Sequence, residues 1–167
     1  MTRINSAIPV RCLTDEHLLA EHREIKRMPY YLRKAIESGS IKNIPEKFTL
    51  GTGHVLFFLD KGKFTLNRYC DIWRECRKRG FDVQDYSGEW IYYILDRMND
   101  YEPTDEEREL LIKRISKRIN ESKKKFWHYY GKNVTKNQAV TLLSSLPIGQ
   151  NLIKECLPER EGEYKGV

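Results

Sequence analysis

The sequence predicts an all-α protein, built as a single compact domain of three long helices with short helices between them and a helical C-terminal extension. Two observations predict this fold class. Apolar residues recur at spacings of three and four along each long segment, and residues that favour helix ends flank those segments. The chain has 167 residues, which suffices for one packed core and is too short for two ordinary domains. We therefore expect one domain.

The first long helix is expected between Thr14 and Ser38. Thr14 is a suitable N-cap, the acidic pair Asp15–Glu16 follows in the first turn, and Ser38–Gly39 supplies a stop. Pro29 lacks an amide hydrogen and should kink this helix. One stripe along the helix should face the core; its members are Leu18, His22, Ile25, Pro29, Leu32 and Ile36.

The middle of the chain contains one further long helix. Residues 48–59 are rich in Thr, Phe and Gly and are expected to form a loop under the core. A helix is predicted from Thr65 to Arg79, and Gly80 followed by the apolar Phe81 is typical of a helix end. Residues 90–98 fit a short buried helix or a strand, because so short an apolar run does not separate the two; the helix is preferred.

The third long helix begins after a capping box, in which Thr104 is followed three residues later by Glu107. Leu111, Ile115 and Ile119 then recur every four residues and define its apolar face. Further along the chain, one or two short helices are expected in the extension from the apolar residues Leu142, Leu143, Leu146, Leu152, Ile153 and Cys156. The last ten residues are expected to be disordered.

The positive charge of the chain is concentrated in one segment. The net charge is +6, but residues 112–132 alone hold eight Lys or Arg against the single acid Glu121, a local net charge of +7. The same segment contains aromatic residues at positions 126–130. Cations and rings together suit contacts with nucleic acid phosphates and bases, whereas a solvated helix face beside a core aromatic cluster explains the same pattern. Charge and aromatic content alone leave these two interpretations equal.

Other classes of protein are disfavoured. No apolar run approaches the roughly 20 residues that span a membrane, and the first residues lack the apolar stretch of a secretory signal, so we expect the chain to begin at Met1 in the cytoplasm. The four cysteines, Cys12, Cys70, Cys76 and Cys156, form neither a CxxC pair nor a cluster with zinc-ligand spacing. We expect reduced, buried thiols and no metal site.

Five separate blocks of sequence resemble one known family, and they occur in the same order. They are MTRIN at residues 1–5, DEHLLAEHRE at 15–24, LGTGHVLFFLDK at 50–61, ECRKRGF at 75–81 and WHYYGK at 127–132. Together they resemble the phage-type endonuclease V family of pyrimidine-dimer DNA glycosylases, which are also abasic-site lyases. The resemblance implies a helical domain over residues 1–132 whose N-terminus is threaded between two helices. Residues 133–167 are then an extension, expected to pack on the same domain.

The resemblance also implies the site residues and the partner. The nucleophile is the α-amine of Thr2 once Met1 is removed, and the essential carboxylate is Glu24; neither a metal nor a cofactor takes part. The partner is double-stranded DNA containing UV photoproducts or abasic sites, bound by a monomer in a bacterial or phage-infected cell. The residues that correspond to DNA-binding positions are Arg3, His17, Arg23, Arg27, Arg114, Arg118, Trp127, Tyr129, Tyr130 and Lys132.

Elementary chemistry explains why a chain end suits this task. An α-amine has a pKa of about 7.7–8.0 against about 10.4 for lysine, so roughly a tenth of it is neutral and nucleophilic at pH 7. Two alternatives stay open: a catalytically silent module that binds damaged DNA, and an enzyme of the same chemistry for another lesion. Without the resemblance, Glu24 and Arg27 are better explained as an ordinary surface ion pair.

Overall fold

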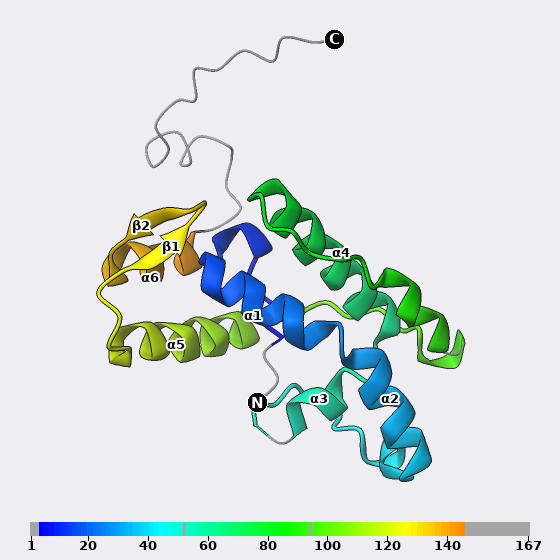
Figure 1. Cartoon of the computed structure of the whole chain (residues 1–167). Coiled ribbons are helices and arrows are strands. Elements are labelled where there is room, and N and C mark those ends of the chain that lie inside the picture. The colour runs from blue at the N-terminus through cyan, green and yellow to red at the C-terminus, as the bar shows by residue number, and fades with distance from the viewer. Residues whose placement is uncertain (1–3, 52, 94, 146–167) are drawn as a thin grey trace, which may run out of the picture.

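The computed structural model describes residues 4–51, 53–93 and 95–145, and these are mostly helical (Figure 1). The all-α prediction is confirmed, with one small hairpin as the exception. The α-helices are α1 (Asp15–Ile25), α2 (Met28–Glu37), α3 (Gly53–Phe57), α4 (Gly62–Lys78), α5 (Asp105–Glu121) and α6 (Lys136–Ser144). The remaining elements are the 3₁₀ turns η1 (Val10–Cys12), η2 (Ser40–Asn43), η3 (Ser87–Tyr92) and η4 (Leu95–Arg97), and the antiparallel strands β1 (Trp127–Tyr129) and β2 (Lys132–Val134).

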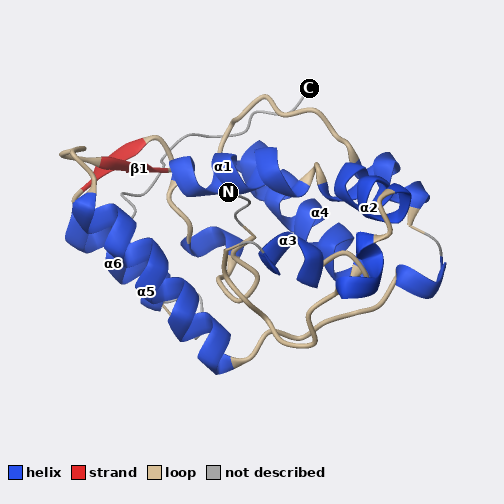
Figure 2. Ribbon diagram, turned by 90° about the horizontal axis from the view of Figure 1, so that it is seen from below, coloured by secondary structure: helices blue, strands red, loops and turns tan. Residues whose placement is uncertain are grey.

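Helix α1 is the centre of the arrangement. It packs against α4 along its length and against β1 near its N-terminus. Helices α5 and α6 lie against each other on one side of α1, and α2 and α3 lie on the other side (Figures 1 and 2). A single cluster of buried apolar side chains joins these parts, from Ile4 and Ile8 before α1 to Leu143 in α6. The extension up to residue 145 therefore shares the core of the rest.

The first predicted helix is in fact two helices. A kink was expected at Pro29, but the chain instead has a complete break between α1 and α2. Helix α1 ends at Ile25, and α2 begins at Met28 with Pro29 in its first turn. Proline costs little there, because the first amides of a helix have no partner within it. The apolar stripe is buried from Leu18 to Leu32, but Ile36 is 43% exposed. The break turns α2 away from α1 (Figure 1).

Residues 48–59, expected to be a loop, contain the short helix α3. Gly51 before it has a φ of 85°, which only glycine adopts without strain. Helix α4 begins at Gly62, three residues before the predicted start. It ends as predicted: Gly80 has a φ of 83°, and the amide of Phe81 donates to the carbonyl of Cys76 at 3.0 Å.

The helix preferred for residues 90–98 is present only in part: residues 90–92 end the 3₁₀ turn η3 and Leu95–Arg97 form η4, whereas Met98 forms an isolated bridge with Lys61. Trp90 is buried and its Nε1 donates to the hydroxyl of Thr65 at 3.1 Å. This hydrogen bond fastens η3 to α4.

The N-terminal ends of α5 and α6 are each capped by a threonine. The hydroxyl of Thr104 accepts from the amide of Glu107 at 3.3 Å, but the carboxylate of Glu107 accepts from Tyr101. A full capping box is present at α6, between Thr135 and Gln138. Leu111, Ile115 and Ile119 are buried on α5, as expected. Helix α6 fulfils part of the helical expectation for the extension; residues 146–167, including Leu146, Leu152, Ile153 and Cys156, lie outside the described chain.

Cys12, Cys70 and Cys76 are unpaired thiols. Burial raises the pKa of Cys76 to about 11, so this thiol is protonated and unreactive at neutral pH. Within the described ranges no helix is both long and apolar enough to cross a membrane.

Candidate functional site

Helix α1 carries the predicted carboxylate, Glu24, near its C-terminal end. The Glu24 side chain is 24% exposed, and its Oε1 lies 3.8 Å from Nη1 of Arg27. Arg23 and Arg27 are exposed beside it. The predicted reach between Glu24 and Arg27 is confirmed, and the break between α1 and α2 places a partly open carboxylate among cations.

The chain entering the fold is buried against this same helix. Ile4 is fully buried and Asn5 is 3% exposed. The amide of Asn5 donates to Oε1 of Glu21 at 3.0 Å, and its Nδ2 donates to Oε2 of Glu21 at 2.7 Å. Glu21 precedes Glu24 by three residues, about 4.5 Å along the helix axis. Thr2 and Arg3 lie outside the described residues; two residues extend at most about 7 Å.

Glu21 is a charge with no solvent exposure, and it is neutralised by Arg68 of α4. Arg68 donates to both carboxylate oxygens, through Nε at 2.9 Å and Nη2 at 3.1 Å, and through Nη1 to the carbonyl of Ile8 at 2.7 Å. Such a two-pronged contact satisfies a buried carboxylate well. It also holds the entering chain between α1 and α4.

Helix α5 also contacts the entering chain, through Arg114. Nη2 of Arg114, one of the predicted DNA-binding residues, donates to Oδ1 of Asn5 at 2.8 Å. Arg118 lies one turn further along α5 and is half-buried, while Lys113 and Lys117 are exposed. Arg114 of α5 and Glu21 of α1 therefore meet at Asn5, in the segment where the described chain begins.

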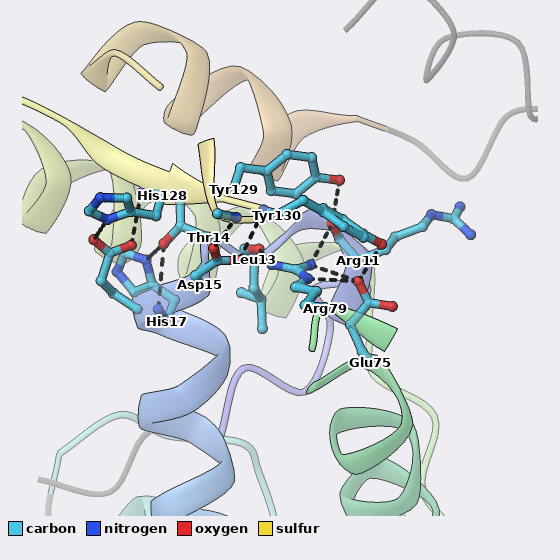
Figure 3. A network of polar contacts seen from close by, with 12 residues as sticks. Arg11, Leu13, Thr14, Asp15, His17, Glu75, Arg79, His128, Tyr129 and Tyr130 are labelled. Atoms are coloured by element: carbon cyan, nitrogen blue, oxygen red, sulfur yellow. Dashed lines mark hydrogen bonds and ion pairs between the residues drawn. The ribbon is translucent and has the colours of Figure 1, made fainter. Parts of the chain in front are cut away.

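The hairpin β1–β2 is fastened to the other end of α1 (Figure 3). The carboxylate of Asp15 accepts from the amides of Tyr130 at 3.1 Å and Gly131 at 2.8 Å. Both residues have positive φ, 49° and 72°, as in the tight turns that join two strands. Arg79, whose side chain has no solvent exposure, donates to Asp15 at 2.9 Å and pairs with Glu75 at 2.8 Å. The turn is thus anchored on buried charges.

The predicted recognition aromatics are part of this anchoring. Trp127 is 7% exposed and stacks on His17 with ring centroids 4.8 Å apart. The hydroxyl of Tyr129 donates to the carbonyl of Arg11 at 2.9 Å, and that of Tyr130 donates to Glu75 at 2.7 Å. His17 is itself buried, and its Nδ1 lies 2.7 Å from the hydroxyl of Thr14. These four side chains hold the hairpin on the body of the protein.

Phe126 is the aromatic side chain of this segment that stands out from the surface, with 50% exposure. Phe126 is not among the DNA-binding positions that the resemblance implies. It directly follows the basic run Lys123–Lys125, and that position between cations and a buried tryptophan is the signal that could have identified it. Lys132, at the start of β2, is also exposed.

A surface ion cluster adds to the fastening of the hairpin. The carboxylate of Glu16 accepts from the amide of His128 at 3.1 Å, from its Nδ1 at 3.0 Å and from Nζ of Lys124 at 3.2 Å. Partial burial disfavours the charged form of Glu16, but the hydrogen bonds from His128 and Lys124 outweigh it and lower the pKa to about 2. Because the pKa of Glu16 is lower in the folded protein than in the unfolded chain, its charge stabilises the fold at neutral pH. This contribution is lost only as the pH falls from the ordinary pKa of a glutamate towards about 2.

We expect Asp15→Ala to destabilise the protein by about 2–3 kcal/mol, because it leaves two backbone amides without their charged acceptor and removes one of the two carboxylates that pair with Arg79. Urea unfolding measures this effect. Asp71→Ala is a matched control: its exposed carboxylate lies 3.3 Å from Arg74, and its loss should cost less than about 0.5 kcal/mol. Equal effects of the two substitutions would contradict the anchoring role.

The site contains no evident metal centre: within the part of the chain that the structure describes, no group of His, Cys, Asp or Glu is placed to hold an ion. The hairpin and the predicted carboxylate lie at opposite ends of α1. Asp15 under the hairpin and Glu24 are nine residues apart, about 13 Å along the helix. That span corresponds to about four base pairs of duplex.

A family model described as pyrimidine dimer DNA glycosylase matches residues 1–86, more than half of the chain. The matched stretch includes Glu21, Glu24 and Arg68, and it ends in the segment after α4. It agrees with the resemblance noted in the sequence. The chain therefore belongs to the pyrimidine dimer DNA glycosylase family, also called the endonuclease V family, and its general activity is that of a glycosylase on UV-damaged DNA.

Proposed function

We propose that this protein is a glycosylase and abasic-site lyase that uses the α-amine of Thr2. The observation that supports it most is the burial of Ile4 and Asn5 against α1, one turn from Glu24. Since two residues extend no more than about 7 Å, the amine is confined to the neighbourhood of this helix.

The proposed reaction begins with attack by the neutral amine on C1′ of the 5′ nucleotide of the dimer. A bond forms between the amine nitrogen and C1′, and the glycosidic bond breaks with its electron pair leaving on the base, which is protonated. Opening of the C1′–O4′ bond, with protonation of O4′, then gives a Schiff base. Loss of a C2′ proton expels the 3′ phosphate by β-elimination, which cuts the strand.

Glu24 acts on the charges and protons of these steps. As a carboxylate it stabilises the positive charge that develops on the sugar, and in the second stage it accepts the C2′ proton. Its partial exposure suits both roles, since the group must meet a substrate. Arg23 and Arg27 beside it provide phosphate contacts. The nearby cations also favour the neutral form of the terminal amine.

The proposed DNA surface runs from the end of α1 to the hairpin. Cations on α1, α5 and β2 contact the phosphates, the buried aromatics and His17 set the position of the hairpin, and the exposed ring of Phe126 meets the bases. We propose one DNA-bound monomer and no separate second domain, because α6 shares the core with α5. The proposed contacts are Arg3, Arg23, Arg27, Arg114, Arg118, Phe126 and Lys132, with His17, Trp127, Tyr129 and Tyr130 as supports.

Borohydride trapping tests the proposal. The mature protein is incubated with a duplex containing one cyclobutane dimer, or one abasic site, and reduced with borohydride. We expect a covalent adduct whose peptide map places the sugar on the amine of Thr2. Binding to both duplexes without any adduct would instead support a silent damage-binding module. An adduct with the abasic duplex alone would support an enzyme of the same chemistry for another lesion.

The exposed ring of Phe126 gives a separate expectation. Phe126→Ala should weaken binding to the dimer-containing duplex by about 1–3 kcal/mol, the range for one ring stacked on a base. Undamaged duplex should be affected less, because its bases stay stacked. Fluorescence titration of both duplexes measures the difference. Tyr92→Ala, which removes a ring of 54% exposure on η3, is the control and should leave both affinities unchanged.

A further inference from the structure

Asn5 is the meeting point of three structural elements. Its backbone amide and Nδ2 bond to Glu21 of α1, and its Oδ1 accepts from Arg114 of α5. Glu21 in turn is held by Arg68 of α4. Both ends of the Asn5 side-chain amide are hydrogen-bonded, Nδ2 as a donor to Glu21 and Oδ1 as an acceptor from Arg114, so the orientation of this side chain is fixed by its surroundings.

The residue before it is held by a histidine. The amide of Ile4 donates to Nε2 of His54 at 3.3 Å, and Nδ1 of His54 lies 2.9 Å from the carbonyl of Thr49. Because an amide can only donate, Nε2 must accept, and the ring proton is therefore on Nδ1. Burial lowers the pKa of His54, which keeps the ring in this neutral form.

These contacts form a clamp on residues 4 and 5, made by Glu21, Arg68, His54 and Arg114. We propose that this clamp positions the reacting amine relative to Glu24, with Asn5 as the positioning residue; this rests on the proposed function. Glu21 of the clamp and Glu24 lie on the same helix, α1, so the nucleophile and the proton acceptor are positioned relative to one rigid element. A displacement of about 1 Å can reduce a rate by about a hundredfold. None of the clamp residues needs to touch the DNA to have this effect.

The clamp has a second consequence through Arg114. The guanidinium that we place near the phosphates also holds the side chain of Asn5. DNA bound along α5 and the side chain of Asn5 would therefore share one arginine. The position of the nucleophile is thereby coupled to the surface that receives the duplex.

The test is Asn5→Ala in the full-length mature protein, with abasic duplex as substrate. Single-turnover cleavage at saturating enzyme should be slower by about 10- to 100-fold, while the Kd for uncleaved abasic-analogue duplex should change less than about threefold. Reductive alkylation of the chain end by a small aldehyde, without DNA, should proceed at the wild-type rate. The chemistry of the amine is then intact and only its placement is lost.

A buried control separates positioning from loss of stability. Ile72→Val removes one methyl group from the core face of α4, at a residue of 0% exposure outside the clamp. Thermal unfolding compares the two variants, and Ile72→Val should keep the wild-type cleavage rate. His54→Gln offers a second test, because its carbonyl can still accept from Ile4; it should cleave faster than His54→Ala.

The outcomes are distinct. Wild-type cleavage by Asn5→Ala, or equal slowing in Ile72→Val at the same loss of stability, overturns the clamp. A rise in Kd that matches the fall in rate makes Asn5 a DNA contact and also overturns it. If the wild-type protein forms no borohydride adduct, the proposed function itself fails.

Discussion

Glu24→Gln should abolish most strand cleavage and leave DNA binding intact. Glutamine keeps the size of the side chain but can neither balance the positive charge on the sugar nor take up the C2′ proton. We expect single-turnover cleavage of dimer-containing duplex to fall by about 10³-fold or more, within the range for a lost acid–base group. The Kd should stay the same or decrease, because a negative charge near the phosphates is removed.

The control for this substitution is another glutamate on an exposed helix face. Glu37 of α2 is 54% exposed and pairs with Lys34 at 2.9 Å, and Glu37→Gln should leave cleavage unchanged. Partial salvage by Glu24→Asp, with a carboxylate held about 1.5 Å further back, would support a role for the charge itself. Cleavage at the wild-type rate by Glu24→Gln would remove this residue from the mechanism.

The helices could be predicted from the sequence because their signals are local. Thr14, Thr104 and Gly80 mark helix ends through bonds within a few residues, and all three have the expected roles in the structure. The break between α1 and α2 was underestimated for the same reason. Pro29 signals an interruption, but the direction of the new helix depends on what each side packs against.

The partners of the charged residues could not be predicted, since they are distant in the sequence. Glu21 pairs with Arg68, 47 residues away, and Arg114 with Asn5, 109 residues away. Glu21 and Glu24 look alike as acids three residues apart on one helix, yet one is fully buried and the other is partly open. Periodicity assigns a residue to a face of its helix; it does not identify the residue that will neutralise a charge there.

The hairpin was missed because its strands are too short to show a pattern. Three residues per strand give little alternation, and five aromatic or basic residues at 126–130 suggest a cluster of rings more strongly than a turn. Gly131 is the residue from which the hairpin could have been predicted, because glycine between two short polar or aromatic runs is typical of a hairpin turn. With the hairpin in place, Trp127 is buried against His17 and the neighbouring ring of Phe126 is exposed.

Moving the chain end by one residue should have the largest effect of all. An alanine inserted between Met1 and Thr2 displaces the terminal amine by up to about 3.5 Å, while every contact from Ile4 onward can remain. The resulting protein still has a terminal primary amine, so a nucleophile of the same kind remains present. We expect loss of both cleavage and borohydride trapping by about 10³-fold or more, since orientation supplies a large part of the barrier reduction.

Thr2→Ala is the matched control for the displaced amine. It removes the threonine side chain but leaves the amine in place, and alanine is small enough for Met1 still to be removed, which intact-mass measurement verifies. We expect its cleavage rate to remain within about tenfold of the wild type, because a supporting side chain contributes less than the nucleophile itself. Acetylation of the amine should then silence both this variant and the wild-type protein. Full incision by the acetylated or inserted forms would rule out the chain end as nucleophile and direct the search to a lysine near Glu24, for which Lys26 is the nearest in sequence.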